Sequence, residues 1–251
     1  MLQIFLFIAS ILIDKYKIGF SKVIMASVLW FGFNIWLLDD IGPKYLKIKY
    51  YTGEDNTKDH DMITRKIIIK TGMNYLMFYV MTWLMWQSSP INPLSHLKEF
   101  TKLIGGLVQS SVLFYLLHRL AHTRYLYKYI HKSHHMFNNP FACVALYSGH
   151  VEFLMVNCTS IFLPIYLLSM CRSYGLIYSL IGIRNIIVAH TTYEFVNKPM
   201  NLIFGNSYFH HIHHAKNIYN YGLETAFMDW ILGTMYKKQQ DTEKSIEMLD
   251  K

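Results

Sequence analysis

Five long apolar runs constrain the fold of this chain more than any other feature of its sequence. They cover residues 18–38, 67–87, 103–120, 151–170 and 174–190. The first run, IGFSKVIMASVLWFGFNIWLL, has 21 residues and as a helix would measure about 31 Å, the thickness of the hydrocarbon core of a bilayer. Runs of this kind predict helices that enter or span a membrane, and the last two predict a helical hairpin around the short polar break CRSY.

The overall composition also favours a membrane protein over a soluble globule. Hydrophobic residues make up 53% of the chain and charged residues only 16%, where about 25% is usual for soluble domains. Lys and Arg, which give the formal charge of +8, lie mainly in the connections between apolar runs, where positive charge faces the cytoplasm and anionic lipid. This placement argues against nucleic acid as a partner. We therefore expect an all-α, polytopic membrane helical bundle.

The distribution of Lys and Arg predicts the orientation of the bundle. Residues 39–71 hold seven of them, whereas residues 88–102 hold two, so the first connection is expected to be cytoplasmic. Counting spans forward from there places residues 119–150 and 191–251 on the cytoplasmic side as well.

Histidines are crowded into those two cytoplasmic segments and their borders. Eleven of the 13 lie in the 97 residues from His118 to His214, and most of them fall in three short groups, HRLAH, HKSHH and FHHIHH. Ordinary surface or core histidines would not gather in this way. The groups predict a histidine-rich helical cap on the cytoplasmic side of the bundle.

The spacing within each group suits metal binding. His118 and His122 are four residues apart, which on a helix separates the two rings by about 40°. The other two groups each place three histidines at positions i, i+3 and i+4, within about 100° of helical arc: His131, His134 and His135, and then His210, His213 and His214. On the same helical geometry His211 points about 110° away from its neighbours and is not expected to share their metal.

The number of candidate ligands predicts two metal ions. The three groups supply eight histidines, and His190, at the end of an apolar run, is a natural ninth. A tetrahedral zinc site needs at most four protein ligands. Neutral imidazole suits zinc, copper, iron and nickel, so the ligand set leaves the element open. A haem site is disfavoured because these histidines lie at the ends of apolar runs, and a pH-sensing cluster would not require repeated spacing.

The three groups together resemble the HxxxH, HxxHH and HxxHH boxes of the fatty acid hydroxylase and sterol desaturase superfamily. Four flanking segments are similar to further elements of that superfamily: SGHVE, AHTTYEF, NYG and FMDWILGTMY. The resemblance covers about residues 100–236. It departs from the usual pattern at Val151, where proline is common, at Thr191 and Thr192, which replace Ser-Gly, and at His211, which often is aspartate.

Several residues beside the boxes are open to more than one interpretation. His150 stands next to the departure at Val151 and is open to three interpretations: a metal ligand, a hydrogen-bond donor to a ligand, or an interfacial polar residue. Glu152 and Glu194 are expected either to orient ligating histidines, as metal-bound imidazoles generally require, or to be solvated carboxylates. Asp229 is expected to fix a turn rather than to bind metal.

The resemblance implies an oxygen-dependent di-iron enzyme that oxidises an unactivated C–H bond of a lipid, with the nine histidines as metal ligands. It also implies an external electron donor of the cytochrome b5 and reductase type, and residence in the endoplasmic reticulum. Lys128 and Lys132, in an expected cytoplasmic segment, suit either docking of an acidic donor or contact with lipid headgroups. The corresponding domain division is 1–100 for membrane-anchor helices and a basic loop, 101–240 for the catalytic domain, and 241–251 for a polar tail.

Two other functional classes remain open at the level of sequence. A membrane acyl desaturase would share the three-box arrangement but give an alkene. A metal transporter or sensor would hold histidines without consuming O2. The choice between a sterol and a fatty acyl or sphingolipid substrate is likewise open.

Overall fold

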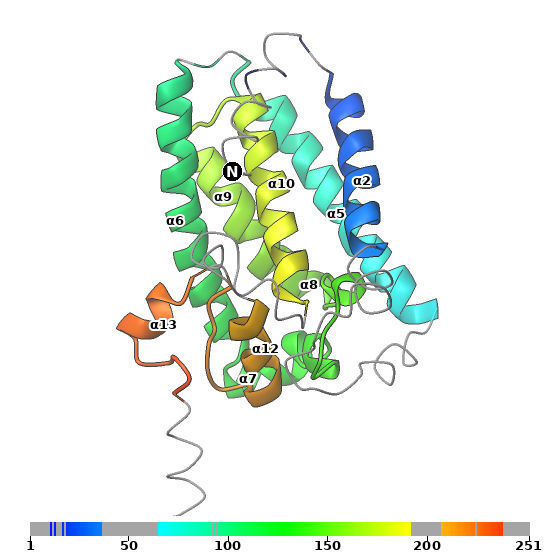
Figure 1. The fold of residues 1–251 in the computed structure, drawn as a ribbon, viewed down its shortest axis with the longest axis vertical. Coiled ribbons are helices and arrows are strands. Elements are labelled where there is room, and N and C mark those ends of the chain that lie inside the picture. The colour runs from blue at the N-terminus through cyan, green and yellow to red at the C-terminus, as the bar shows by residue number, and fades with distance from the viewer. Residues whose placement is uncertain are drawn as a thin grey trace, which may run out of the picture.

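The computed structural model describes residues 11, 13, 17, 19–36, 65–91, 93, 95–191, 207–223 and 225–237. All regular elements within these ranges are helices. Five upright helices form a bundle (Figure 1), and one of the five is a continuous run of the three elements α8, η5 and α9. The bundle consists of α2 (Phe20–Trp36), α5 (Arg65–Ser88), α6 (His96–Ala121), α8 (His150–Glu152) with η5 (Phe153–Cys158) and α9 (Thr159–Leu167), and α10 (Arg172–Ala189).

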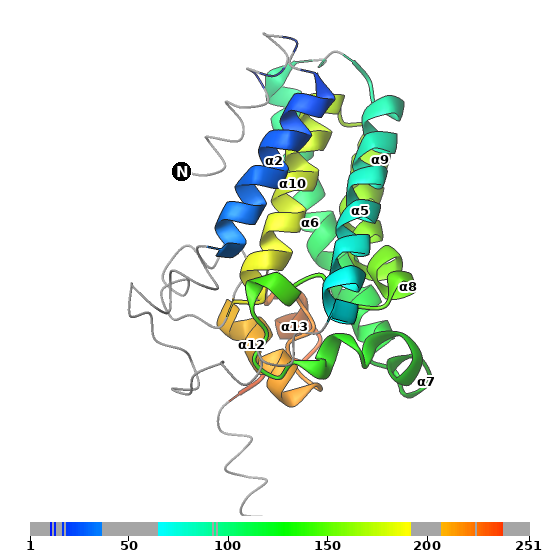
Figure 2. The same ribbon diagram turned by 90° about the vertical axis from the view of Figure 1, so that its right-hand side faces the viewer.

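Short helices cover one end of this bundle. In both Figure 1 and Figure 2, α7, α12 and α13 lie below the lower ends of α6 and α10. The helices of this end are α7 (Arg124–Leu126), η2 (Tyr127–His131), η3 (His134–Met136), η4 (Ala142–Val144), α12 (Ser207–Lys216) and α13 (Phe227–Ile231). All three histidine groups belong to this end of the molecule.

Each predicted apolar run forms a helix, although two boundaries differ from the sequence expectation. Helix α6 begins at His96, seven residues before its apolar run, because the Ser95 hydroxyl caps it by accepting a hydrogen bond from Lys98 N at 3.2 Å. The break in the helical hairpin falls between Leu167 and Arg172, three residues earlier than CRSY.

In the described part of the chain, two helices are long and apolar enough to cross a membrane, His96–Ala121 and His150–Leu167. The outer surface of the bundle is apolar as well. Leu76 on α5 is 64% exposed, and Leu97 and Val108 on α6 are 73% and 59% exposed. Exposure of such apolar side chains to water is unfavourable, whereas their exposure to lipid is not. These features support association with a membrane.

Close contacts between α6, α9 and α10 depend on glycine. The Tyr178 hydroxyl donates to Gly106 O at 2.7 Å, and a Cβ at position 106 would lie 2.9 Å from the Tyr178 ring. A Cβ at Gly182 would lie 2.7 Å from Ile161 Cγ1. Small residues allow helix backbones to approach closely where lipid gives no hydrophobic drive for association.

Several expectations concern residues outside the described ranges. They include residues 1–10 of the expected anchor region, the basic residues Lys44, Lys47, Lys49 and Lys58, the positions Thr192 and Glu194, and the tail 241–251.

Candidate metal centre

The structure brings all nine candidate ligands together in two neighbouring groups. Within each group the ring nitrogens that face one another lie within 4.8 Å. The first group contains five histidines and the second contains four: His118, His122, His131, His135 and His213, and then His134, His190, His210 and His214. All are buried except His122, which is half-buried.

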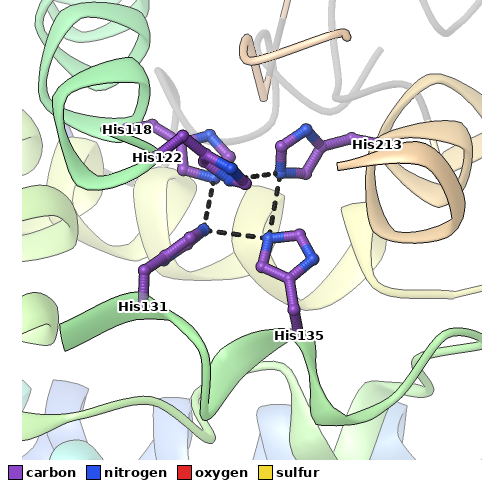
Figure 3. Close-up of side chains that lie close together, drawn as sticks. All are labelled: His118, His122, His131, His135 and His213. Atoms are coloured by element: carbon purple, nitrogen blue, oxygen red, sulfur yellow. Dashed lines mark hydrogen bonds between the residues drawn. The ribbon is translucent and has the colours of Figure 1, made fainter. Parts of the chain in front are cut away.

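The first group joins residues of α6, η2, η3 and α12 around one point (Figure 3). Four Nε2···Nε2 contacts link its rings in sequence: His118 to His131 at 3.1 Å, His131 to His135 at 2.9 Å, His135 to His213 at 3.2 Å and His213 to His122 at 3.1 Å. His118 and His122 come from the end of α6, whereas His213 comes from α12.

The second group lies beside the first and shares η3 and α12 with it. His190 Nε2 is 3.2 Å from both His134 Nε2 and His210 Nε2. His190 is the C-cap of α10, so the helix that precedes it carries this ligand from the bundle to the histidine end. The fourth member, His214, has a buried Nε2 with no hydrogen-bond partner among the described residues.

The HKSHH group is not the continuous α-helical face that its spacing predicts. A π-helix ends at His131, and a separate 3-10 helix begins at His134, where His135 has non-helical φ and ψ of −78° and 17°. His131 and His135 therefore face the first group while His134 faces the second. In α12, which is a regular helix, His210 and His214 face the second group and His213 faces the first.

Main-chain carbonyls fix the orientation of five rings through their Nδ1 atoms. A carbonyl oxygen only accepts, so in the neutral ring Nδ1 carries the proton and Nε2 presents its lone pair. The five pairs are His118 with Tyr221 O at 2.7 Å, His134 with Tyr147 O at 3.1 Å, His190 with Ile186 O at 2.7 Å, His213 with Tyr219 O at 2.7 Å and His214 with Phe137 O at 3.1 Å.

The pair His134 and His190 shows that this arrangement fits a cation. Both Nδ1 atoms donate to carbonyls, so their two Nε2 atoms face each other at 3.2 Å with neither able to donate in the neutral form. Burial lowers the pKa of His134 to about 4 and the pKa of His190 to about 3, so both rings are neutral at pH 7. Converging lone pairs at this distance repel unless a metal ion lies between them.

Glu152 is buried against a candidate ligand and is not a solvated carboxylate. Its Oε1 lies 2.7 Å from His131 Nδ1, and the residue is 2% exposed. A carboxylate in this place holds the ring so that Nε2 faces the other histidines.

We expect Glu152→Ala to weaken metal binding by about 10- to 100-fold, because the His131 ring loses the group that orients it. Glu152→Gln keeps an acceptor oxygen and should lose less. Chelator competition on the purified protein measures both. Glu99→Gln is a matched control, since Glu99 is also buried, at 1% exposed, but bonds Lys102 and Cys171 N near the opposite end of the bundle. Unchanged metal affinity in Glu152→Ala would contradict the proposal that Glu152 orients the His131 ring.

The remaining candidate residues lie outside both groups. His150 Nδ1 is 2.7 Å from Asn74 Oδ1, and His211, although only 5% exposed, belongs to neither group. Asp229 holds a turn, as expected: its carboxylate accepts from Tyr221 N at 2.8 Å, from Gly222 N at 2.7 Å and from the Thr234 hydroxyl at 2.7 Å. This turn presents the Tyr221 carbonyl to His118.

Asn74 is a residue of this region that sequence reasoning did not single out. It is fully buried on α5, where its Nδ2 donates to Leu146 O at 2.8 Å and its Oδ1 meets His150. It thereby ties the bundle to the loop before α8. Its position inside an apolar run is the feature by which it could have been found, since polar residues within spans usually have a partner or a function.

Comparison with known proteins agrees with this geometry. The family model described as fatty acid hydroxylase matches residues 103–234, which is more than half of the chain and includes all nine histidines. The chain belongs to the fatty acid hydroxylase family. The resemblance seen in the three histidine boxes is thus confirmed.

Relatives within the superfamily carry different names. The chain is 34% identical to methylsterol monooxygenase 1 of Rattus norvegicus over 145 residues, which is 56% of this chain and 48% of the relative. A Dictyostelium discoideum protein, provisionally named a methylsterol monooxygenase, is 28% identical over 89% of this chain and 86% of its own length. The very-long-chain aldehyde decarbonylase GL1-11 of Oryza sativa subsp. indica is 31% identical over 57% of this chain and 54% of the relative.

The chain therefore spans about half the length of the rat and rice relatives that it matches. No solved structure matches it.

Proposed function

We propose that this protein is a membrane-bound, O2-dependent di-iron oxidase that hydroxylates or desaturates a C–H bond of a lipid. The observation that carries the proposal is the pair of histidine groups, whose buried Nε2 lone pairs converge at the ends of apolar helices. Family membership supports the choice of iron over the other metals that imidazole binds.

The nine histidines would hold two iron ions, five at one and four at the other. Bound iron would supply the redox chemistry that an aliphatic C–H bond requires, because such a bond offers no acidic proton or leaving group to general acid–base catalysis. The side chains of this chain bind and orient. Carbonyls and Glu152 hold the ring tautomers, and burial excludes water from the rings.

The helices of the bundle provide the route for a lipid. Helices α6 and α10 both end at candidate ligands, His118 and His190, so a hydrocarbon chain in the bilayer can reach the centre without passing through water. The Phe114 ring lies 5.0 Å from the His118 ring, centroid to centroid, and supplies an apolar surface beside the first group.

The names of the relatives leave the substrate open. Methylsterol monooxygenase and very-long-chain aldehyde decarbonylase denote different reactions on different lipids, and this chain is similar to both at comparable identity. We propose a sterol or a fatty acyl or sphingolipid substrate.

Comparative lipid profiling tests the proposed reaction. Cells that express the wild type should accumulate an oxidised lipid that is absent from cells expressing His131→Ala at equal protein level. A product heavier by one oxygen atom identifies hydroxylation, and a product lighter by two hydrogen atoms identifies desaturation. Identical lipid profiles for the two proteins, with the wild type loaded with iron, would contradict an oxidase and favour a metal transporter or sensor.

We further propose that electrons come from a cytochrome b5 and reductase partner. Lys128, just before HKSHH, and Lys132, within it, are both exposed and are suited to attract an acidic donor protein. The same charges also suit contact with lipid headgroups.

The proposed topology is polytopic, in the endoplasmic reticulum, with residues 101–240 as a catalytic domain on the anchor helices of 1–100 and with its histidines on the cytoplasmic side. We expect a protease-cleavable tag inserted near Asp55 and one placed after Lys251 both to be cut from the outside of sealed microsomes, because the Lys and Arg asymmetry puts both in the cytoplasm. A tag introduced in 88–95 should be protected. Opposite protection of the first two tags would show that the span count is wrong.

A further inference from the structure

A small cavity lies between α6 and α10, above the histidines. It has a volume of about 10 Å³ and is lined by Ser110 and Phe114 of α6, Asn157 of η5, and Gly182 and Ile186 of α10. Two of its lining residues contact candidate ligands, since the Phe114 ring lies 5.0 Å from the His118 ring, centroid to centroid, and the Ile186 carbonyl accepts from His190 Nδ1 at 2.7 Å. Above it, a hydrogen bond from the Tyr178 hydroxyl to Gly106 O joins α10 to α6.

Two polar side chains of this cavity have unused hydrogen-bonding capacity. Ser110 is 6% exposed, and neither its hydroxyl nor the Asn157 amide has a hydrogen-bond partner in the described part of the chain. A serine within a helix usually donates to the carbonyl four residues before it, but Gly106 O already accepts from Tyr178. Unsatisfied polar groups are costly at the depth of a bilayer and there indicate a partner or a function.

Neighbouring serines of the same cavity show the usual pattern. The Ser111 hydroxyl donates to Leu107 O at 3.0 Å, and the Ser160 hydroxyl donates to Val156 O. Among the described serines that line the cavity, Ser110 therefore differs from Ser111 and Ser160 in making no such bond.

We propose that Ser110 and Asn157 bind an uncharged oxygen group, a hydroxyl or a carbonyl, of the lipid substrate. The inference rests on the proposed function in taking a lipid as the ligand and the histidine groups as the place where it is oxidised. Hydroxyl and amide groups each donate and accept, which matches an oxygen group. Among the described residues, no charged side chain lines the cavity to bind a phosphate or carboxylate. The volume suits one oxygen group or one water, so the attached hydrocarbon lies beyond the cavity.

The position of the pair also places the oxygen relative to the metals. Ser110 precedes His118 by eight residues on α6, which corresponds to about 12 Å along the helix. The bound oxygen is thus separated from the oxidised carbon by a stretch of hydrocarbon. This separation favours a long-chain lipid over a lipid in which the oxygen group and the oxidised carbon are adjacent.

Binding of matched lipids to the full-length protein in detergent, without O2 so that no turnover occurs, tests the proposal. The probes are 1-hexadecanol against n-hexadecane, and cholestanol against cholestane. The wild type should bind the alcohol of at least one pair about tenfold more tightly than its hydrocarbon, and the double variant Ser110→Ala with Asn157→Leu should lose this preference. Ser111→Ala is the matched control and should keep it.

Equal binding of alcohol and hydrocarbon in both pairs by the wild type would overturn the proposal, as it would mean that the cavity holds water only. Retention of the preference by the folded double variant would overturn it too. The thermal unfolding midpoint checks that each variant is folded. Because the measurement uses neither O2 nor product formation, its failure is distinct from failure of the lipid-profiling experiment.

Discussion

Loaded with ferrous iron under anaerobic conditions, the purified protein is expected to bind about two iron ions per chain, since nine converging imidazoles exceed the needs of one ion. His131→Ala and His134→Ala should each lose at least one ion, because His131 belongs to the first group and His134 to the second. Metal analysis by mass spectrometry gives the number of ions per chain.

His96→Ala is the control for this series. His96 lies at the other end of α6, where its Nδ1 meets the Tyr174 hydroxyl at 3.0 Å, so its removal should leave metal content unchanged. One tightly bound ion per chain in the wild type, kept by both variants, would rule out a dinuclear centre.

Alanine at His210, His213 or His214 is expected to lower lipid oxidation by more than about a hundredfold, because loss of a direct ligand should exceed the effect of losing a group that only orients one. The His211 side chain belongs to neither group, so His211→Asp should retain metal and activity. Initial rates of product formation, normalised to folded protein, compare the four variants.

Burial of His211 calls for a second variant at that position. The side chain is 5% exposed and burial lowers its pKa to about 4, so it is neutral at pH 7, and aspartate would bury a charge. His211→Asn keeps a neutral polar group and separates loss of folding from loss of a ligand. Should a folded His211→Asn protein be as inactive as the alanine variants, the division into two groups would need to be redrawn.

The helices and the candidate ligands follow from sequence because both depend on local patterns. An apolar run of about 20 residues favours a helix in lipid wherever it occurs. Histidines at i and i+4 share a helical face, and His118 with His122 do so at the end of α6.

The conformation of HKSHH does not follow from local pattern. Its residues have the spacing of a helical face, yet the π-helix before His131 and the 3-10 turn at His134 are set by contacts distant in sequence. One is the Glu152 carboxylate on His131, and another is the Tyr147 carbonyl on His134. Every residue has a main-chain carbonyl, so the sequence does not show which carbonyls orient the histidine rings.

The crossing of the two HxxHH segments, each of which serves both groups, has a thermodynamic consequence. An ion in either group must order η3 and α12 together, because each group draws ligands from both of these helices. The first ion bears the conformational entropy cost of this ordering, and the second binds ligands that are already fixed. Binding should therefore be positively cooperative, and a chain holding a single ion should be scarce at every iron concentration.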